Sequence, residues 1–170
     1  MALRDLLRDV AEGWPSYRRL QTTRKDHPEY ELVVRTVPRE LKPLLPSGPS
    51  FKVEGSTGRG NITAAPWIAT FDRSITSSAT HGYYLVYLYS VDLQRLYLAL
   101  AFGTTQFEEY FSKPEERHRR LRSAASHLQA LLSKHRPVHS GPLNLAAGRA
   151  DRMHLDSSST VRAGGRGISH

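Results

Sequence analysis

The stretch from Phe51 to Tyr89 reads FKVEGSTGRGNITAAPWIATFDRSITSSATHGYYLVYLY and places a glycine-rich polar loop directly before a strand-like run that begins at Trp67. The glycines of this loop permit positive φ angles and a close approach of the backbone to a ligand. The neighbouring polar side chains supply hydrogen-bond donors. A loop of this kind beside a large aromatic side chain predicts a recognition site for an anionic ligand. The loop residues are Ser56, Thr57, Gly58, Arg59, Gly60 and Asn61.

The chain is strongly basic. Its 170 residues include 24 Lys and Arg against 16 Asp and Glu, which gives a formal net charge of +8. Polyanions are the natural partners of a protein with this charge. No apolar stretch reaches membrane-spanning length, and residues 1–10 lack the uninterrupted hydrophobic region of a signal peptide. We therefore expect a cytoplasmic protein that meets nucleic acid and has no membrane partner.

Two helical segments are predicted before the glycine-rich loop. In residues 3–14 the apolar side chains recur at three- and four-residue intervals, and Gly13 and Pro15 are expected to end this helix. The apolar stripe predicts that one side of the helix faces the core. Residues 28–45 show the same spacing, with Pro38 as an expected break.

A third helix is predicted in the C-terminal part of the chain. Ser112 is its expected cap, and Pro137 stops it. The sequence then becomes polar and glycine-rich, with one short strand expected at residues 152–155. We expect residues 1–156 to form the domain and residues 157–170 to be a flexible or truncated tail. The predicted buried stripe of the helix is Leu121, Ala125, Leu128 and Leu132.

Four strands are predicted, at residues 51–54, 67–71, 82–89 and 95–102. Only a tight connection separates the last two, which indicates an antiparallel hairpin. Successive side chains of a strand point to opposite faces, so Tyr84, Val86 and Leu88 share one face of the third strand. Because both faces of this strand are apolar, we expect it to be central. The predicted fold class is α+β, with a small, mainly antiparallel twisted sheet flanked by helices in a single domain.

Trp67 has two interpretations. A tryptophan in a strand next to a proline often anchors a core. If Trp67 instead lies on a strand beside the third one, Trp67, Tyr84 and Leu88 wall an aromatic pocket that is wide enough for a planar base. The sequence is compatible with both interpretations.

The cations outside the loop also have two interpretations. They form either a solvated surface that keeps the protein in solution or a set of weaker contacts to phosphate groups. One group follows the first helix, and the other lies on the last helix. The candidate phosphate contacts are Arg18, Arg19, Arg24, Lys25, Arg117 and Arg120.

An enzymatic function would have to use the acids and the histidine nearest the loop. These are Glu54, Asp72, His81 and Asp92, and their spacing matches no catalytic signature or zinc pair. The loop sequence GSTGRGN also lacks the lysine followed by serine or threonine that a P-loop needs. We therefore expect a protein that is not an enzyme and that carries no metal or cofactor.

The order of these motifs resembles a known family. The run GSTGRGNITAAPWIATFD followed by HGYYLVYLYSVDLQRLYLAL is similar to the N-terminal DNA-binding domain of McrB-like methylcytosine-specific restriction proteins. The shared pattern is a glycine loop ending in GN, a PW dipeptide, a G-x-Y strand and a hairpin. The resemblance is good over residues 51–103 and poor after about residue 157.

The resemblance implies a mode of recognition. In that family the domain flips methylated cytosine out of duplex DNA into a pocket. By position, Trp67 would be a pocket wall, and Tyr84 and Leu88 would pack around the base and its methyl group. The glycine loop would approach the DNA, with Arg59 at the tip filling the gap left by the base or anchoring a phosphate, where McrB has an aromatic residue.

The resemblance also implies a cellular role. McrB-like proteins join this domain to a motor and other relatives join it to a nuclease, so we expect a separate nuclease or motor component here. The expected function is recognition of 5-methylcytosine in duplex DNA within a bacterial type IV restriction system, with the protein at the nucleoid when bound. The alternatives are a reader of another modified base, a nuclease or glycosylase using Glu54, Asp72 or His81, and a protein-interaction module whose charge is incidental.

Overall fold

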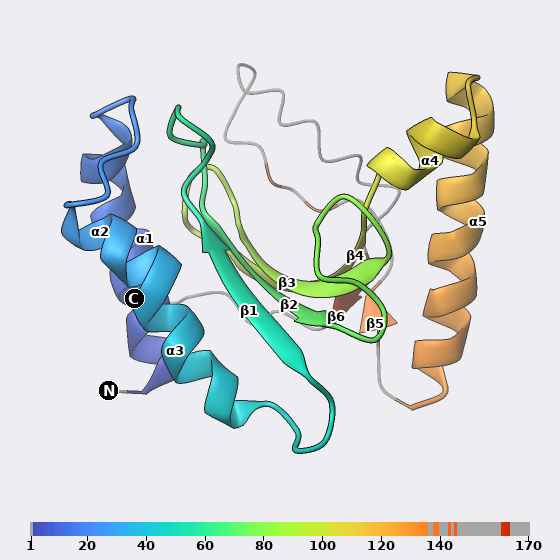
Figure 1. Cartoon of the computed structure of the whole chain (residues 1–170), viewed down its shortest axis with the longest axis horizontal. Helices are drawn as coiled ribbons and strands as arrows, with labels where there is room; N and C mark the ends of the chain where they lie inside the picture. The colour runs from blue at the N-terminus through green and yellow to red at the C-terminus, as the bar shows by residue number, and fades with distance from the viewer. Residues whose placement is uncertain (1, 136–137, 140–142, 144, 146–160, 164–170) are drawn as a thin grey trace.

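A computed structural model of the whole chain describes residues 2–135, 138–139, 143, 145 and 161–163. An antiparallel sheet separates a group of N-terminal helices from α4 and α5 (Figure 1). The strand order is β1-β2-β3-β4-β6-β5. The strands are β1 Phe51–Ser56, β2 Trp67–Asp72, β3 Tyr83–Tyr89, β4 Leu96–Phe102, β5 Val138–His139 and β6 Val161–Ala163. The helices are α1 Leu3–Arg18, α2 Pro28–Glu31, η1 Leu32–Thr36, α3 Val37–Leu41, η2 Lys42–Leu44, α4 Thr105–Tyr110 and α5 Pro114–Ser133.

The predicted end of the first helix is wrong. Helix α1 continues through Gly13 and Pro15 to Arg18. Gly13 has a packing role instead, because a Cβ atom at this position would lie 2.7 Å from Oε1 of Glu29. The missing side chain therefore lets the glutamate of α2 lie directly against α1.

The predicted break at Pro38 is also wrong, because the chain stays helical from α2 to η2. Proline has no N–H group, and its ring clashes with the carbonyl group four residues earlier in a regular α-helix. The segment before Pro38 widens into the π-helical turn η1, in which the N–H group of Val37 donates to the carbonyl oxygen of Leu32. This wider turn accommodates the proline without ending the helix.

The N-terminal helices and one face of the sheet enclose the first hydrophobic cluster. Trp14, Tyr17, Val33 and Ile68 are fully buried there. Burial of a large apolar side chain stabilises a fold by about 1.5–3 kcal/mol. The Tyr89 hydroxyl donates to the carbonyl oxygen of Leu7 at 2.8 Å, so the central sheet is also tied to α1 by a hydrogen bond across the cluster.

The predicted hairpin and the central position of its first strand are confirmed, since β3 lies between β2 and β4. The connection is a turn in which the Asp92 carboxylate accepts hydrogen bonds from the Ser90 hydroxyl and the Gln94 N–H group. These hydrogen bonds lower the pKa of Asp92. The carboxylate of Asp92 thus has a structural role in the turn.

The helices after β4 differ more from the sequence-based prediction than the N-terminal helices do. Of the expected stripe on α5, only Leu121 is buried, while the side chain of Leu132 is 37% exposed. The N-cap is Lys113 and not Ser112, and α4 was not predicted. None of the helices in the described ranges is long and apolar enough to cross a membrane.

The strand expected at residues 152–155 lies outside the described residues. Part of the predicted tail does join the sheet, because β6 pairs with β4 and with β5. The division of the chain at residue 156 stays a prediction.

The close packing of β1 against η1 makes Gly55 a sensitive position. A Cβ atom there would lie 1.9 Å from the carbonyl oxygen of Val33, and backbone cannot move away as a flexible side chain would. We expect Gly55→Ala to destabilise the fold by roughly 1–3 kcal/mol or more. Gly48→Ala is the control, because that site is open and only its positive φ of 116° costs energy. Equal unfolding midpoints in urea for Gly55→Ala and the unsubstituted protein would contradict this packing.

Candidate nucleic-acid interface

The sheet face that points away from α1 carries rows of large and small side chains across β1–β4. In the first row Trp67 lies opposite Leu88, and Leu88 lies opposite Tyr97. The second row lies two residues further along each strand and consists of smaller side chains. Its members are Ala69, Val86 and Ala99. The third row has large residues on β2 and β3, where the ring centroids of Phe71 and Tyr84 are 5.0 Å apart, and the small Ala101 on β4. We call this arrangement the aromatic trough, with the second row as its floor and the other two rows as its walls.

The spacing of the two walls matches that of two aromatic walls around one flat ring. Its walls are four residues apart along a strand, which corresponds to about 13 Å. A ring that stacks on an aromatic side chain lies about 4.5–7 Å from it, centroid to centroid, so a ring between two such walls needs them about 9–14 Å apart. The small floor residues are buried, and Leu143 and Leu145 belong to the same hydrophobic cluster, so a ring fits between the walls only after the side chains that cover the floor move aside.

The three predicted pocket residues lie in these walls. Trp67 and Tyr84 are half-buried, whereas Leu88 is 6% exposed. The Tyr84 hydroxyl donates to the carbonyl oxygen of Ala79 at 3.3 Å, and burial raises its pKa. The hydroxyl therefore remains a neutral hydrogen-bond donor at physiological pH. The structure brings Trp67, Tyr84 and Leu88 onto one face, as the strand period predicted.

Leucines cover part of the trough. Leu143 and Leu145 pack with the floor residues in the second hydrophobic cluster. The N–H group of Val91 donates to the carbonyl oxygen of Leu145 at 2.8 Å and holds this segment next to the β3–β4 turn.

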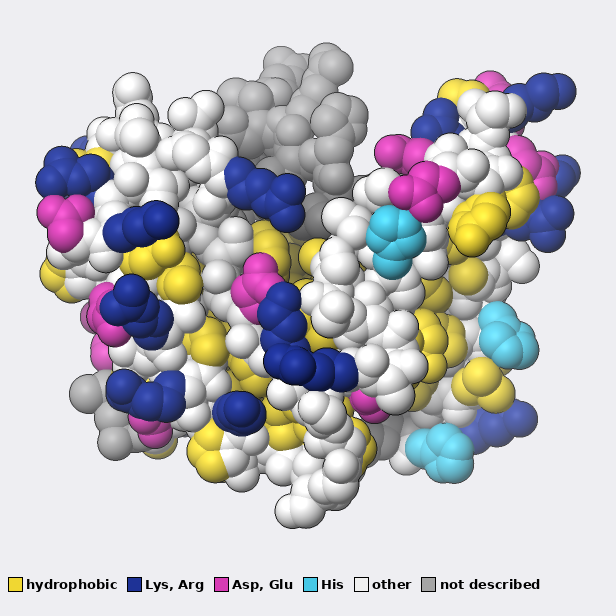
Figure 2. Space-filling view, viewed as in Figure 1, with side chains coloured by type: hydrophobic (Ala, Val, Ile, Leu, Met, Phe, Trp, Pro, Cys, Tyr) yellow, Lys and Arg dark blue, Asp and Glu magenta, His cyan; other side chains and the backbone are white. Residues whose placement is uncertain are grey.

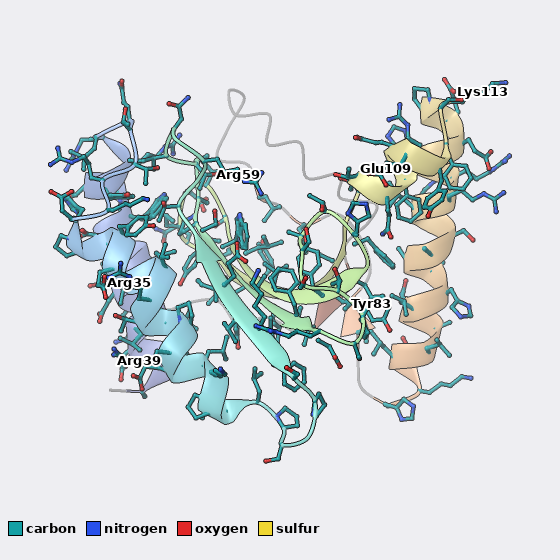
Figure 3. All side chains as sticks on the ribbon, in the orientation of Figure 1. Arg35, Arg39, Arg59, Tyr83, Glu109 and Lys113 are labelled. Atoms are coloured by element: carbon teal, nitrogen blue, oxygen red, sulfur yellow. The ribbon has the colours of Figure 1, made fainter. Side chains whose placement is uncertain are left out.

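A hollow lies between the β1–β2 loop and helix α4. Figure 3 labels Arg59, on the loop between β1 and β2, and Glu109, on α4, at opposite sides of the opening. Figure 2 shows the hollow at this place, with hydrophobic side chains on its floor. The cation at the tip of the glycine loop therefore stands at the rim of an apolar depression.

The glycine loop has a defined conformation. Gly58 and Gly60 have positive φ values of 112° and 82°. The Ser56 hydroxyl accepts the N–H group of Gly58 at 3.2 Å, and the carbonyl oxygen of Thr57 accepts the N–H group of Thr63 at 2.8 Å. Thr57 is buried, whereas Arg59 is exposed and forms no hydrogen bond or ion pair within the described part of the chain. The backbone thus presents the Arg59 side chain to solvent.

The loop is also bound to the segment that follows α1. The N–H group of Thr23 donates to the carbonyl oxygen of Gly60, and the N–H group of Ile62 donates to that of Gln21, each at 2.8 Å. Gln21 adopts a positive φ of 64° to make this contact. The sequence does not predict this pairing, because neither segment has the alternating pattern of a strand.

This pairing brings one group of predicted phosphate contacts to the glycine loop. Arg18, Arg19, Arg24 and Lys25 flank the segment that binds the loop. Arg24 donates twice to the carboxylate of Asp26, at 3.0 and 3.2 Å, which raises the pKa of Arg24. The exposed end of α1 and the glycine loop form one basic edge.

The other predicted group lies elsewhere. Arg117 and Arg120 are on α5, across the opening from the glycine loop (Figure 1). Arg120 donates to Glu116 at 2.7 Å and lies over the ring of Phe111, and Arg117 lies 3.8 Å from Glu108. Their charges are partly balanced by these local acids.

The acids and the histidine considered for catalysis have local partners. The Asp72 carboxylate accepts hydrogen bonds from the N–H group and the hydroxyl of Ser74, and these bonds lower the pKa of Asp72. The imidazole of His81 lies 3.0 Å from the carboxylate of Glu109 and 2.9 Å from the Thr80 hydroxyl. Within the described ranges, no three His, Cys, Asp or Glu side chains gather as a metal site would require.

Substitution by alanine should affect stability differently at the adjacent loop residues Gly58 and Arg59. Gly58→Ala would place a Cβ atom 2.2 Å from the carbonyl oxygen of Asn61 in a backbone conformation that disfavours side chains, so we expect a loss of roughly 1–3 kcal/mol of stability. Arg59→Ala should change stability by less than about 0.5 kcal/mol. Thermal unfolding of both variants checks this, and a large effect of Arg59→Ala would show that its side chain supports the fold.

The family of the chain was established by comparison with known proteins. Residues 9–162 match the model of the family described as MrcB-like, N-terminal domain. No curated protein and no solved structure matches the chain. The match covers most of the chain, confirms the resemblance found in the sequence and supports a role as a DNA-binding module. The chain belongs to the MrcB-like N-terminal domain family.

Proposed function

We propose that this domain recognises 5-methylcytosine in duplex DNA by taking the base out of the helix and into the aromatic trough. The observation that carries the proposal is the row of small residues between Trp67 on one wall and Tyr84 on the other. This arrangement makes a slot for one planar ring when the side chains that cover the floor move aside, and the exposed cation of the glycine loop lies at the rim of the hollow beside α4.

Contacts in the trough can offset the free-energy cost of extruding a base. Extruding a base costs a few kcal/mol, and stacking on the trough walls together with hydrogen bonds to the base must offset this cost. Burial of one methyl group contributes only about 0.8 kcal/mol, which is roughly fourfold in affinity. Strong selection for the methyl group therefore requires close packing against buried side chains such as Leu88, with an empty space left when the methyl group is missing.

The basic edge supplies the sequence-independent part of binding. Arg59 and the cations after α1 contact phosphate groups on either side of the extruded base, and Arg59 fills the gap in the helix or anchors a phosphate. Contacts of this kind orient the DNA without reading its sequence, so the domain tolerates different flanking bases.

In the cell, the domain is the specificity module of a modification-dependent restriction system. It carries no catalytic step, metal or cofactor of its own and acts in the bacterial cytoplasm, where it is at the nucleoid when bound to DNA. A separate nuclease or motor component supplies the cleavage. Because the slot accepts flat rings in general, the second candidate is a reader of another modified base.

A binding titration tests the proposal. One duplex is prepared with cytosine, 5-methylcytosine or 5-hydroxymethylcytosine at a single position, at one fixed salt concentration. We expect a preference of about tenfold or more for 5-methylcytosine over cytosine, and loss of this preference in Trp67→Ala. Tyr83→Ala is the matched control, because Tyr83 is an exposed aromatic residue of β3 on the opposite face. Equal binding to all three duplexes would refute the proposal, and selection of the hydroxymethylated duplex would favour the second candidate.

The basic edge gives a separate prediction about salt. Lys25→Gln should weaken binding to all duplexes and reduce the slope of log affinity against log salt by about 1, because one phosphate contact is lost. Lys134→Gln removes another exposed lysine, beyond the end of α5, and should leave the slope unchanged. Equal slopes for both variants would show that the DNA does not cross the edge near the glycine loop.

A further inference from the structure

The row of small residues in the trough continues onto β1 and ends in an acid. Glu54 lies opposite Ala69, which lies opposite Val86. Directly opposite residues of an antiparallel pair have Cβ atoms about 4.5–5.5 Å apart and share a face of the sheet. Glu54 therefore stands at the β1 end of the trough floor, and it is the one acid in the three rows on the described strands β1–β4.

This end of the trough faces solvent. The side chains of Glu54 and Lys52 are 44% and 35% exposed. Leu143 and Leu145 belong to the same buried cluster as the floor residues, and Leu145 accepts the hydrogen bond from Val91 beside the β3–β4 turn. A ring that enters between the walls from this exposed end would meet the Glu54 carboxylate.

The position of the carboxylate is held by its neighbour. Lys52 forms an ion pair with Glu54, donates to the carbonyl oxygen of Ser77 at 3.0 Å and lies 5.4 Å from the ring centroid of Phe71. These three contacts fix the Lys52 ammonium group beside the third row. An ionised carboxylate has about four acceptor positions, so the ion pair leaves Glu54 able to accept further hydrogen bonds.

We propose that Glu54 reads the exocyclic amino group of the base in the trough. This inference rests on the proposed function and deepens it, because it names the feature of the base that is selected besides the methyl group. An ionised carboxylate only accepts hydrogen bonds, and the amino group on C4 of cytosine donates them. A base with a keto oxygen at the same place would face the carboxylate with a second acceptor. Glu54 therefore selects amino-bearing pyrimidines by attraction and rejects keto pyrimidines by repulsion.

Thymine provides the test, because it carries the same methyl group as 5-methylcytosine and has a keto oxygen in place of the amino group. We expect the unsubstituted protein to bind a duplex with 5-methylcytosine opposite guanine roughly tenfold or more tightly than one with thymine opposite guanine. Glu54→Gln should reduce this ratio by about fivefold or more, because an amide can donate to the keto oxygen. Its preference for 5-methylcytosine over cytosine should persist, because the methyl group contacts the trough walls.

Two further variants serve as controls. Glu115→Gln makes the same change at an exposed glutamate in the first turn of α5 and should leave the ratio unchanged. Glu54→Ala should lose affinity for 5-methylcytosine without gaining affinity for thymine, and thermal unfolding confirms that each variant is folded. An unchanged ratio in Glu54→Gln overturns the role of Glu54 while the proposed function stands. If the unsubstituted protein shows no preference for 5-methylcytosine over cytosine, the proposed function itself fails, and the role of Glu54 fails with it.

Discussion

The register of the antiparallel sheet is the constraint on which the rest of the structure depends. Because β1, β2, β3 and β4 pair without a shift, side chains of the same face form straight rows across the strands. A slip of one residue would turn every row to the other face. The same register that buries Ile68 against the N-terminal helices thus places Ala69 between the large residues of the trough.

One face of the sheet forms the main core, and this core also supports the glycine loop. This face packs on α1 and η1 and provides the stability that a small domain needs. That packing also holds the β1–β2 connection next to the glycine loop, because the Trp14 indole N–H group donates to the carbonyl oxygen of Ala64 at 3.2 Å. The core therefore extends to the glycine loop, and the Arg59 side chain is carried by an ordered backbone at the rim of the hollow.

The sequence predicts the elements that depend on local patterns. Alternation in β3 indicated the shared face of Tyr84 and Leu88, because side chains of a strand have a strict period of two. The helix ends at Pro15 and Pro38 were predicted wrongly, because a wider turn and tertiary packing outweigh the local preference of proline. The contact between Gln21 and the glycine loop lies between segments far apart in the sequence, so no local pattern could reveal it. Alternation in WIATFD does place Ala69 between Trp67 and Phe71, but only the register shows that this small residue continues as a row across neighbouring strands.

A structure of the domain bound to a duplex with one 5-methylcytosine tests the central claim most directly. We expect the methylated base to leave the helix and to lie between Trp67 and Tyr84, over Ala69 and Val86, with its amino group toward Glu54. A methylated base that remains paired within the helix, with the DNA bound through cations alone, would contradict it.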